Sequence, residues 1–325
     1  MNAMKTLVRV GAALGLAALL LYGAPPSHAQ TWPQRTVKFI LPLGPGSGAD
    51  IGARLYADRL SKRWGQSVVV ENRPGADGIV AINAFIGARD DHTLLFGPSS
   101  AFVAHPYLHD KMPYDPRELG PVARVSQTLV VIAVPASLNV KSLGELMAMV
   151  RAQPGKLNWA TVTGVTDLIV AGYLKSAGLD MAKVPYRDTV HAINDLAEGR
   201  IHMYIAALAI ARPHIQSGRI KVIAVTNRAR ASFAPDLPTV AESGFPTLEF
   251  DGLAGFFGPR HMADALRERI AADVKAASDQ EIVSRLLATG QVVNPGGPAE
   301  FAASIKEQAD KLAAVAQTLG IKPKQ

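Results

Sequence analysis

Apolar stretches of strand length alternate with segments of helical periodicity along most of this chain. Residues 36–42, 67–71 and 93–97 are short runs rich in β-branched and other apolar side chains, as in buried strands. Between them, residues 50–64 and 79–88 place apolar positions mostly at helical spacing. Strands that alternate with helices of this length indicate β-α-β units, and therefore an α/β fold with mostly parallel sheets.

The same alternation starts again after residue 120. We predict further strands at residues 121–134 (two adjoining runs), 157–160, 183–186, 202–207, 221–226 and 248–259. Helices are expected at residues 142–151, 166–176, 189–197, 209–216 and 298–319. The proline-rich stretch SFAPDLPTVAESGFP predicts a connection rather than a core element. Two such units with a late return segment predict two lobes joined by crossing strands.

The first residues have the pattern of a secretory signal peptide. Lys5 and Arg9 precede an apolar stretch, and small residues lead to an expected cleavage after Ala29. The apolar stretch is short for a membrane span, which needs roughly 20 apolar residues. An uncleaved anchor is the alternative. We expect a signal peptide at residues 1–29, the first part of lobe 1 at 30–126, lobe 2 at 127–228, and at 229–325 a return segment that completes lobe 1 and adds C-terminal helices.

Charge and cysteine content narrow the class of protein. The formal net charge is +7, and removal of Lys5 and Arg9 would leave +5. No Lys/Arg block interleaved with aromatic residues occurs, which argues against nucleic acid as a partner. The chain has no cysteine, so an exported protein of this sequence, most simply a periplasmic one, relies on no disulfide. The small positive excess weakly favours anionic small molecules.

The stretch FILPLGPGSGAD, residues 39–50, is the first candidate site. Gly44 to Ala49 match G-x-G-x-x-G/A after a strand and before a helix, and Glu71 ends the next strand, as in a dinucleotide-binding fold. Export argues against a nicotinamide cofactor, and no Gly-Lys-Ser/Thr follows to make a Walker loop. A bound carboxylate and a tight turn without a ligand are the other interpretations. Asp50 is expected to cap the helix.

Patterns for hydrolytic or metal chemistry are weak in this sequence. It contains neither G-x-S-x-G nor H-E-x-x-H. His105 and His109 are four residues apart, but Pro106 argues against a helix that presents both as metal ligands. Asp90 and Asp91 are interpreted as a solvated turn. We therefore predict no enzymatic activity, no cofactor and no metal.

Three loops rich in Gly, Ser and Thr each follow a predicted strand and precede a helix, at residues 44–50, 97–100 and 161–166. Backbone N–H groups at helix starts, with nearby hydroxyls, can hold a carboxylate without a cationic side chain. Ligands of open α/β sheets bind at the carboxyl ends of strands. The loops therefore predict a cleft between the lobes that binds a small anion.

A series of short motifs runs in order along nearly the whole mature chain: PLGPGSGAD, VVVENRPGADG, TLLFGPSS, MPYDP, PGKLNWAT, VPYRD, PHIQSGRIKVIAVTN, DLPTVAESGFP and FFGP. In these motifs the chain resembles the Bug family, the periplasmic substrate-binding proteins of tripartite tricarboxylate transporters. The resemblance implies a two-lobed fold of the type II, Venus-flytrap kind. It also implies a carboxylated ligand that main-chain amides and ordered waters hold and that is delivered to membrane transporter subunits.

The resemblance, together with the loop composition, defines the expected ligand-binding residues. They are Gly46, Ser47, Gly48, Ala49, Asp50, Ser99 and Ser100 in the first lobe, and Thr161, Thr163, Gly164, Thr166, Tyr186 and the position of Ala206 in the second. For Tyr186, packing at a strand end is the alternative to a place near the cleft floor.

The second-lobe loop departs from the family pattern. Leu168 and Ile169 stand where relatives usually have a Thr-His or similar pair, and Ala206 stands at or near a position where many have Asp. If that Asp serves a ligand's amino group, its absence argues against an amino-acid ligand. Asp167 is interpreted as a helix cap or as a charge that would repel a second carboxylate.

These observations together predict a monomeric periplasmic solute-binding protein for a small organic acid, such as a dicarboxylate or an aromatic acid. Its partners would be the integral membrane subunits of a tripartite tricarboxylate-type transporter. An extracytoplasmic sensing module that signals to a sensor kinase is an alternative with the same fold. An exported NAD-binding oxidoreductase is a remote alternative.

Overall fold

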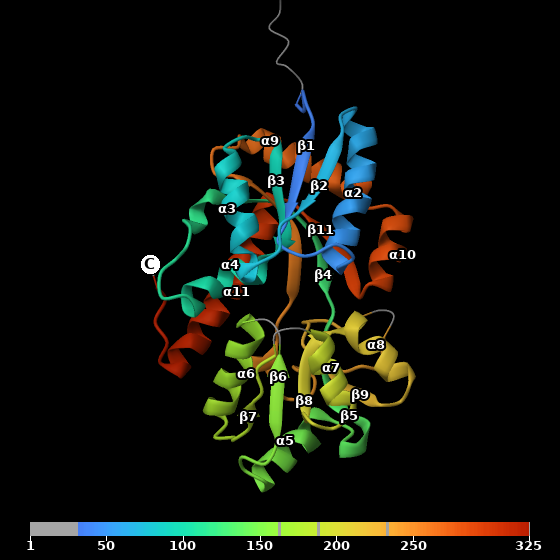
Figure 1. The fold of residues 1–325 in the computed structure, drawn as a ribbon, viewed down its shortest axis with the longest axis vertical. Helices are drawn as coiled ribbons and strands as arrows, with labels where there is room; N and C mark the ends of the chain where they lie inside the picture. The colour runs from blue at the N-terminus through green and yellow to red at the C-terminus, as the bar shows by residue number, and fades with distance from the viewer. Residues whose placement is uncertain (1–31, 162–163, 187–188, 232–233, 325) are drawn as a thin grey trace, which may run out of the picture. The chain divides into compact units, whose positions relative to one another are not determined.

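The computed structural model describes residues 32–161, 164–186, 189–231 and 234–324, with the backbone alone for Ser100 and Ala101 (Figure 1). The predicted signal peptide at residues 1–29 lies outside this part of the chain. Both sheets belong to one unit, Thr36–Gln325.

The first sheet has the strand order β11-β4-β10-β3-β1-β2. Strand β1 pairs in parallel with β2 and β3, whereas β10 runs antiparallel to β3 and β4, and β11 antiparallel to β4. The strands are β1 Val37–Leu41, β2 Val68–Asn72, β3 Thr93–Pro98, β4 Leu119–Thr128, β10 Gly252–Pro259 and β11 Gln291–Gly296.

The second sheet has the strand order β7-β6-β8-β5-β9. Strand β6 pairs in parallel with β7 and β8, and β5 runs antiparallel to β8 and β9. The strands are β5 Val130–Pro135, β6 Asn158–Thr161, β7 Ala182–Lys183, β8 Met203–Ala207 and β9 Ile220–Val225.

The predicted two-lobed α/β fold is confirmed, but the prediction of mostly parallel sheets was wrong. Among the described strands, four pairings are parallel and five are antiparallel. The reason is that the chain crosses between the sheets twice, from β4 into β5 and back from β9 to β10. Strands β5 and β10, which follow a crossing, run away from the boundary between the sheets. The strands on either side of each run toward that boundary.

Helices cover both faces of each sheet (Figure 1). Side chains of successive strand residues point to opposite faces of a sheet. On one face, Ile40 packs with Phe257 and with α3 and α11. On the other face, Phe39 contacts Phe256, which in turn contacts Tyr56 of α2. The helices are α2 Gly48–Trp64, α3 Ile79–Ala88, α4 Ser99–Leu108, α5 Leu143–Ala152, α6 Gly164–Ser176, α7 Thr189–Ala197, α8 Leu208–Gln216, α9 Asp264–Ala277, α10 Gln280–Ala288 and α11 Pro298–Leu319.

Helix α11 joins the cores of the two lobes. Phe301, near its start, is fully buried in the apolar cluster of the first sheet. Leu312, three turns later, is buried in the cluster that contains Val170 of α6. A Cβ on Gly172 of α6 would lie 2.6 Å from a methyl carbon of Val315. The two helices therefore pack closely because Gly172 has no side chain.

Strand β11 and the extent of helix α4 differ from the sequence prediction. Strand β11 was not predicted, because its six residues contain only two apolar β-branched side chains and include Pro295. A helix was expected after the loop at residues 97–100, but its extent was not predicted, because Pro106 lies in the last turn of α4. Both elements contribute residues to the sites described below.

Candidate functional site

The carboxyl ends of four strands meet at the boundary between the two sheets. In the first sheet, Pro98 at the end of β3 pairs with Ala254 near the start of β10. In the second, Ala207 at the end of β8 pairs with Val130 at the start of β5. Because β10 and β5 begin where the chain has crossed the boundary, β3, β8 and their parallel neighbours β1 and β6 end there. The predicted loops therefore lie at the carboxyl ends of the strands, where α/β folds bind ligands.

The glycine-rich loop after β1 ends in a capped helix start. Ser47 is the N-cap of α2, and its Oγ accepts a hydrogen bond of 3.2 Å from the N–H of Asp50. Gly46 has a φ of 81°, in the region that favours glycine. The prediction that Asp50 caps the helix was wrong. Its carboxylate instead accepts the N–H of Gly46 at 2.9 Å and so fastens the loop to the first turn.

The Asp50 carboxylate is the centre of a buried polar network. Asp50 is only 3% exposed, and its carboxylate accepts hydrogen bonds from Arg54 Nε at 3.1 Å and from Asn72 Nδ2 at 2.9 Å. Burial by itself would raise the pKa of this carboxyl, but the bonds from Arg54, Gly46 and Asn72 outweigh burial and lower it below its ordinary value of 3.8. Sequence reasoning missed both Arg54 and Asn72, because only the fold brings β2 beside this loop.

The backbone N–H groups in the first turn of α2 are the groups of this loop that could bind an anion. Among the residues that the structure describes, the N–H groups of Gly48 and Ala49 have no acceptor. Gly48 lies against Gln291 of β11, and a Cβ on Gly48 would be 2.8 Å from Gln291 Nε2. The buried Gln291 is held by Ser126, whose Oγ donates to Gln291 Oε1 at 2.8 Å. Gln291 was missed because β11 was not predicted.

The end of β2 does not support the dinucleotide interpretation of this loop. Glu71, which a dinucleotide fold would place on the ribose, accepts a bond of 2.6 Å from Arg73 Nε. The Gly46 N–H is bonded to Asp50 rather than open to a pyrophosphate. Both groups that the nucleotide would need are already bonded within the protein.

The loop after β3 is tied to α11. Ser99, the first residue of α4, is fully buried, and its Oγ donates to Gln308 Oε1 at 2.9 Å. Gln308 Nε2 in turn donates to the carbonyl oxygen of Asp251. The hydroxyl of Ser99 therefore donates its hydrogen bond to α11, and this bond holds α4 against α11. The side chain of Ser100, the other predicted hydroxyl, lies outside the described residues.

The second-lobe loop is organised around Asp167. Thr161, at the end of β6, donates its hydroxyl to Asp167 Oδ1 at 2.5 Å, and Lys183 of β7 donates to Oδ2 at 2.7 Å. Asp167 lies in the first turn of α6, and the ammonium group of Lys183 compensates its negative charge. Lys183 was predicted only as part of a strand. Its role depends on the pairing of β7 with β6, which no local pattern specifies.

The other predicted residues of this loop lie at the start of α6, except Thr163, which is outside the described residues. Gly164 is the first residue of the helix, and a Cβ there would lie 2.3 Å from a methyl carbon of Leu108 in α4. Thr166 is buried, as are the apolar Leu168 and Ile169, which pack in the core of the lobe. The start of α6 is thus the part of the second lobe that approaches α4 of the first.

Tyr186 and Ala206 both pack within the second lobe. The Tyr186 hydroxyl donates to Asp195 of α7 at 2.6 Å. Burial, followed by the bond and the charge of Asp195, raises the pKa of Tyr186 to about 12. Ala206 belongs to the apolar cluster that contains Val131 and Leu208. The contacts of Tyr186 are those expected of the packing interpretation.

A Tyr186→Phe variant tests this interpretation. We expect it to lower the free energy of unfolding by about 1 kcal/mol, because one hydrogen bond within the lobe is lost, and to leave ligand affinity unchanged. Urea unfolding and isothermal titration would measure the two quantities. A clear loss of affinity at unchanged stability would instead identify Tyr186 as a ligand contact.

A cavity away from these loops is an alternative ligand site. Its volume is about 510 Å³, and it is lined by β4, α6, α11 and the segment before β10, but by none of the predicted ligand-binding residues. Three cationic side chains line it and each is already paired: Arg228 with Glu307, Lys311 with Glu249 at 2.6 Å and Arg124 with Glu300 at 3.5 Å. Because an anion would have to displace those carboxylates, we consider the strand-end loops the stronger candidate.

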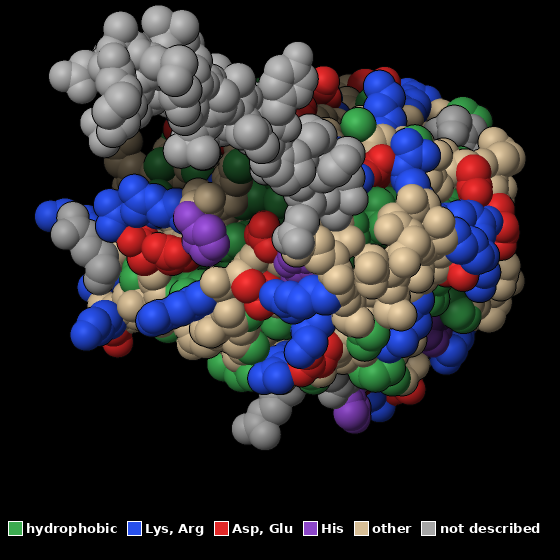
Figure 2. All heavy atoms as spheres, turned by 90° about the horizontal axis from the view of Figure 1, so that it is seen from above, with side chains coloured by type: hydrophobic (Ala, Val, Ile, Leu, Met, Phe, Trp, Pro, Cys, Tyr) green, Lys and Arg blue, Asp and Glu red, His purple; other side chains and the backbone are tan. Residues whose placement is uncertain are grey.

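Charged side chains of both signs share one face of the molecule. On the face seen in Figure 2, the Lys and Arg side chains are interspersed with Asp and Glu rather than gathered by sign. In the described part of the chain, no helix is long and apolar enough to cross a membrane.

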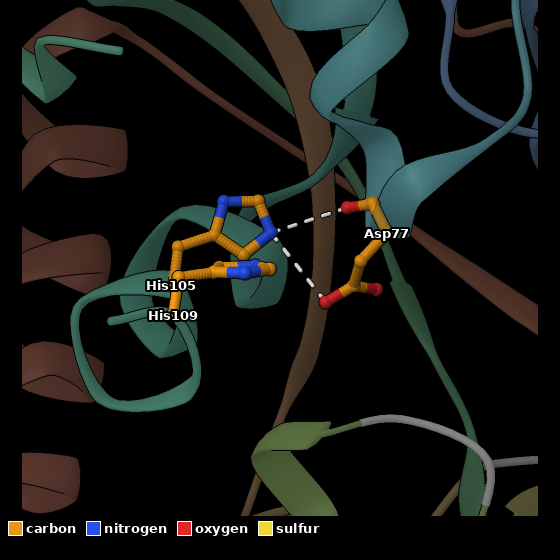
Figure 3. A group of neighbouring side chains, drawn as sticks. All are labelled: Asp77, His105 and His109. Atoms are coloured by element: carbon orange, nitrogen blue, oxygen red, sulfur yellow. Dashed lines mark hydrogen bonds and ion pairs between the residues drawn. The ribbon is translucent and has the colours of Figure 1, made fainter. Parts of the chain in front are cut away.

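The expectation about His105 and His109 rested on a wrong prediction of structure. Helix α4 continues through Pro106 to Leu108, and the N–H of His109 still bonds to the carbonyl of His105 at 3.2 Å. Pro106 removes only its own N–H bond, which a last helical turn tolerates. Both imidazoles therefore lie next to Asp77 of the short helix η1 (Ala76–Gly78), as Figure 3 shows.

Known proteins resemble this chain in sequence and in fold. Residues 52–321 match the family described as tripartite tricarboxylate transporter family receptor. A UPF0065 protein of Bordetella bronchiseptica is 33% identical over 94% of this chain and 92% of its own. The solved structure of R. palustris Rpa4515 with adipate has a TM-score of 0.78 at 28% identity, covering 90% of this chain and 100% of that one.

A second similar structure was also solved with a carboxylate. MatC (Rpa3494) from Rhodopseudomonas palustris with bound malate has a TM-score of 0.71 at 28% identity, covering 87% of this chain and 99% of that one. The two structures thus have the fold of this chain over nearly their whole lengths.

Proposed function

This chain belongs to the tripartite tricarboxylate transporter receptor family, which confirms the resemblance seen in its motifs, and we propose that it is a periplasmic binding protein for a small dicarboxylate. It would bind the ligand between its lobes and deliver it to the membrane subunits of such a transporter. The family is one of receptors rather than enzymes.

The observation that carries the proposal is the pair of unpartnered amides at the start of α2. Gly48 and Ala49 have no acceptor in the described part of the protein, and they lie at the end of β1, where the first sheet meets the second. N–H groups in a first helical turn attract an anion through the helix dipole. We assign one ligand carboxylate to these amides. Asp50 would orient them without touching the ligand.

Neutralisation of Asp167 by Lys183 would allow a second ligand carboxylate to approach the second lobe. Its ammonium compensates Asp167 at the mouth of the second-lobe loop, where an uncompensated Asp would repel an anion. Adipate and malate, found in the two similar structures, each carry two carboxylates. A ligand of this class could therefore bridge the start of α2 in one lobe and the start of α6 in the other.

A Lys183→Met variant tests the role of this lysine. We expect affinity for the preferred dicarboxylate to fall by about tenfold, or about 1.4 kcal/mol, because Asp167 loses its counter-charge. Affinity for the matching monocarboxylate should change much less. Lys175→Met, on the exposed last turn of α6, is the matched control. Equal affinities in both variants and the wild type would exclude Lys183 from the site.

The proposed function is tested by titrating the protein with mono-, di- and aromatic carboxylic acids and with neutral sugars. We expect saturable heat and thermal stabilisation with at least one dicarboxylate and none with the sugars. A response to sugars alone would contradict the proposal. Delivery to a transporter requires a separate test, in which deletion of the gene should abolish cellular uptake of the ligand identified in vitro.

A further inference from the structure

We propose that Asp77, His105 and His109 form a binding site for a divalent transition-metal cation, with Zn²⁺ as the best fit (Figure 3). One potential ligand atom from each of the three residues lies within 4.8 Å of the other two. The site is independent of the proposed carboxylate site and rests only on the contacts of these side chains and their neighbours.

The distance between His105 and Asp77 fits a shared cation. His105 Nε2 lies 3.5 Å from Asp77 Oδ2. A tetrahedral centre with bonds of about 2.1 Å separates its ligand atoms by about 3.4 Å, so a cation can bind both with little movement. The one contact that it would replace is the bond from His105 Nε2 to the carbonyl oxygen of Asp77, at 3.1 Å.

Tyr114 provides the second contact that a metal-binding histidine needs. The Tyr114 hydroxyl lies 2.8 Å from His105 Nδ1, and His105 is fully buried. With a cation on Nε2, the ring proton moves to Nδ1 and is donated to the Tyr114 oxygen, which fixes the orientation of the ring.

His109 has a buried ring nitrogen, Nε2, for which the described residues provide no hydrogen-bond partner. The ring lies edge-on to that of His105, with 5.1 Å between the ring centroids. A buried polar atom without a partner costs free energy, and a third metal ligand from this imidazole would pair one of its nitrogens.

Asp77 brings an oxygen ligand from another part of the chain. It follows β2 in the turn GADG, where Ala76 and Asp77 both have positive φ, at 47° and 53°. The Asp77 side chain is 52% exposed, which leaves space for a water molecule as a fourth ligand. Two imidazoles and one carboxylate suit Zn²⁺, with Cu²⁺ and Ni²⁺ as competitors, rather than Ca²⁺ or Mg²⁺, which prefer oxygen ligands.

The position of the site suggests what a bound cation would do. It would fasten η1 to the last turn of α4, and Leu108, which precedes His109, contacts the start of α6 in the second lobe. A cation would therefore stabilise the part of the first lobe against which the second lobe packs. We expect the effect to be thermal stabilisation of the whole protein, because binding to the native state alone favours that state.

Isothermal titration of the metal-free full-length protein with Zn²⁺ tests the proposal, with thermal unfolding as a second measurement. We expect one Zn²⁺ per chain and a raised Tm, and no such response to Ca²⁺ or Mg²⁺. Asp77→Asn and His109→Gln should each weaken Zn²⁺ binding by more than about tenfold and abolish the rise in Tm. Neither variant removes the buried His105, so both should fold.

His261→Gln is the matched control, because His261 is exposed and lies outside the cluster. It should bind Zn²⁺ as the wild type does. The proposal would be overturned if the wild type bound no Zn²⁺, or if Asp77→Asn and His109→Gln bound it as tightly as His261→Gln.

Discussion

Gly46→Val is expected to abolish carboxylate binding while the protein remains folded. Gly46 has a φ of 81°, and a residue with a Cβ there costs on the order of 1–2 kcal/mol, more when the side chain is β-branched. The loop would relieve this strain by changing its path. Ser47 would then leave its N-cap position, and the amides of Gly48 and Ala49 would no longer point to the ligand.

Two further variants of the same loop make this result specific. Gly44→Val is the matched control, because Gly44 has no positive φ and a Cβ there meets no atom within 4 Å. It should bind nearly as the wild type does. Ser47→Ala should weaken binding only modestly, because it removes one neutral hydrogen bond worth about 0.5–1.5 kcal/mol. Isothermal titration, with circular dichroism to confirm folding, would measure all three; wild-type affinity in Gly46→Val would place the ligand elsewhere.

Asp50→Ala should lower the free energy of unfolding by about 2–3 kcal/mol at neutral pH. The variant leaves the Gly46 N–H, the Asn72 amide and the Arg54 guanidinium without their shared acceptor. Asp58→Ala, in the same helix, is the control. Asp58 is exposed and pairs with Lys62 and Arg59 on the surface, so its loss should have little effect.

The pH dependence of this difference follows from the pKa of Asp50. That pKa lies below its ordinary value of 3.8 in the folded protein, so the carboxylate stabilises the fold at all pH values above about 3.8. As the pH falls through the lowered pKa, the group is protonated in both states and the stabilisation is lost. Urea unfolding of the wild type and Asp50→Ala should therefore show a difference that is constant near neutrality and decreases in acid. A difference that grew in acid would contradict the assignment.

Much of the fold could be predicted because it depends on local periodicity. The apolar runs of β1, β2, β3 and β9 and the helical spacing of α3 and α7 agree with the prediction to within about one residue. Ser47 and Asp50 also carried a local pattern that was not used: a serine followed three residues later by an acidic residue marks an N-cap. Applied to this loop, that pattern would have identified the cap correctly.

The directions of the strands could not be predicted, because hydrophobic patterns do not say where a chain crosses from one sheet to the other. The same holds for α4, where proline propensity favours a break but packing against α6 and α11 preserves the helix. Propensity is a weak preference of a few kcal/mol at most, and burial of a helix face can exceed it.

The sequence by itself determined the alternation of strands and helices, the glycine-rich turn at Gly46 and the family to which the chain belongs, since each is a property of neighbouring residues. Only the tertiary structure decided which groups are committed and which remain for a ligand. Asp50 is bonded to Asn72, Ser99 to Gln308 and Asp167 to Lys183, and each pair joins elements that are separate in the sequence. The physical reason is that hydrogen bonds and ion pairs act over a few ångströms in space, whatever the distance along the chain.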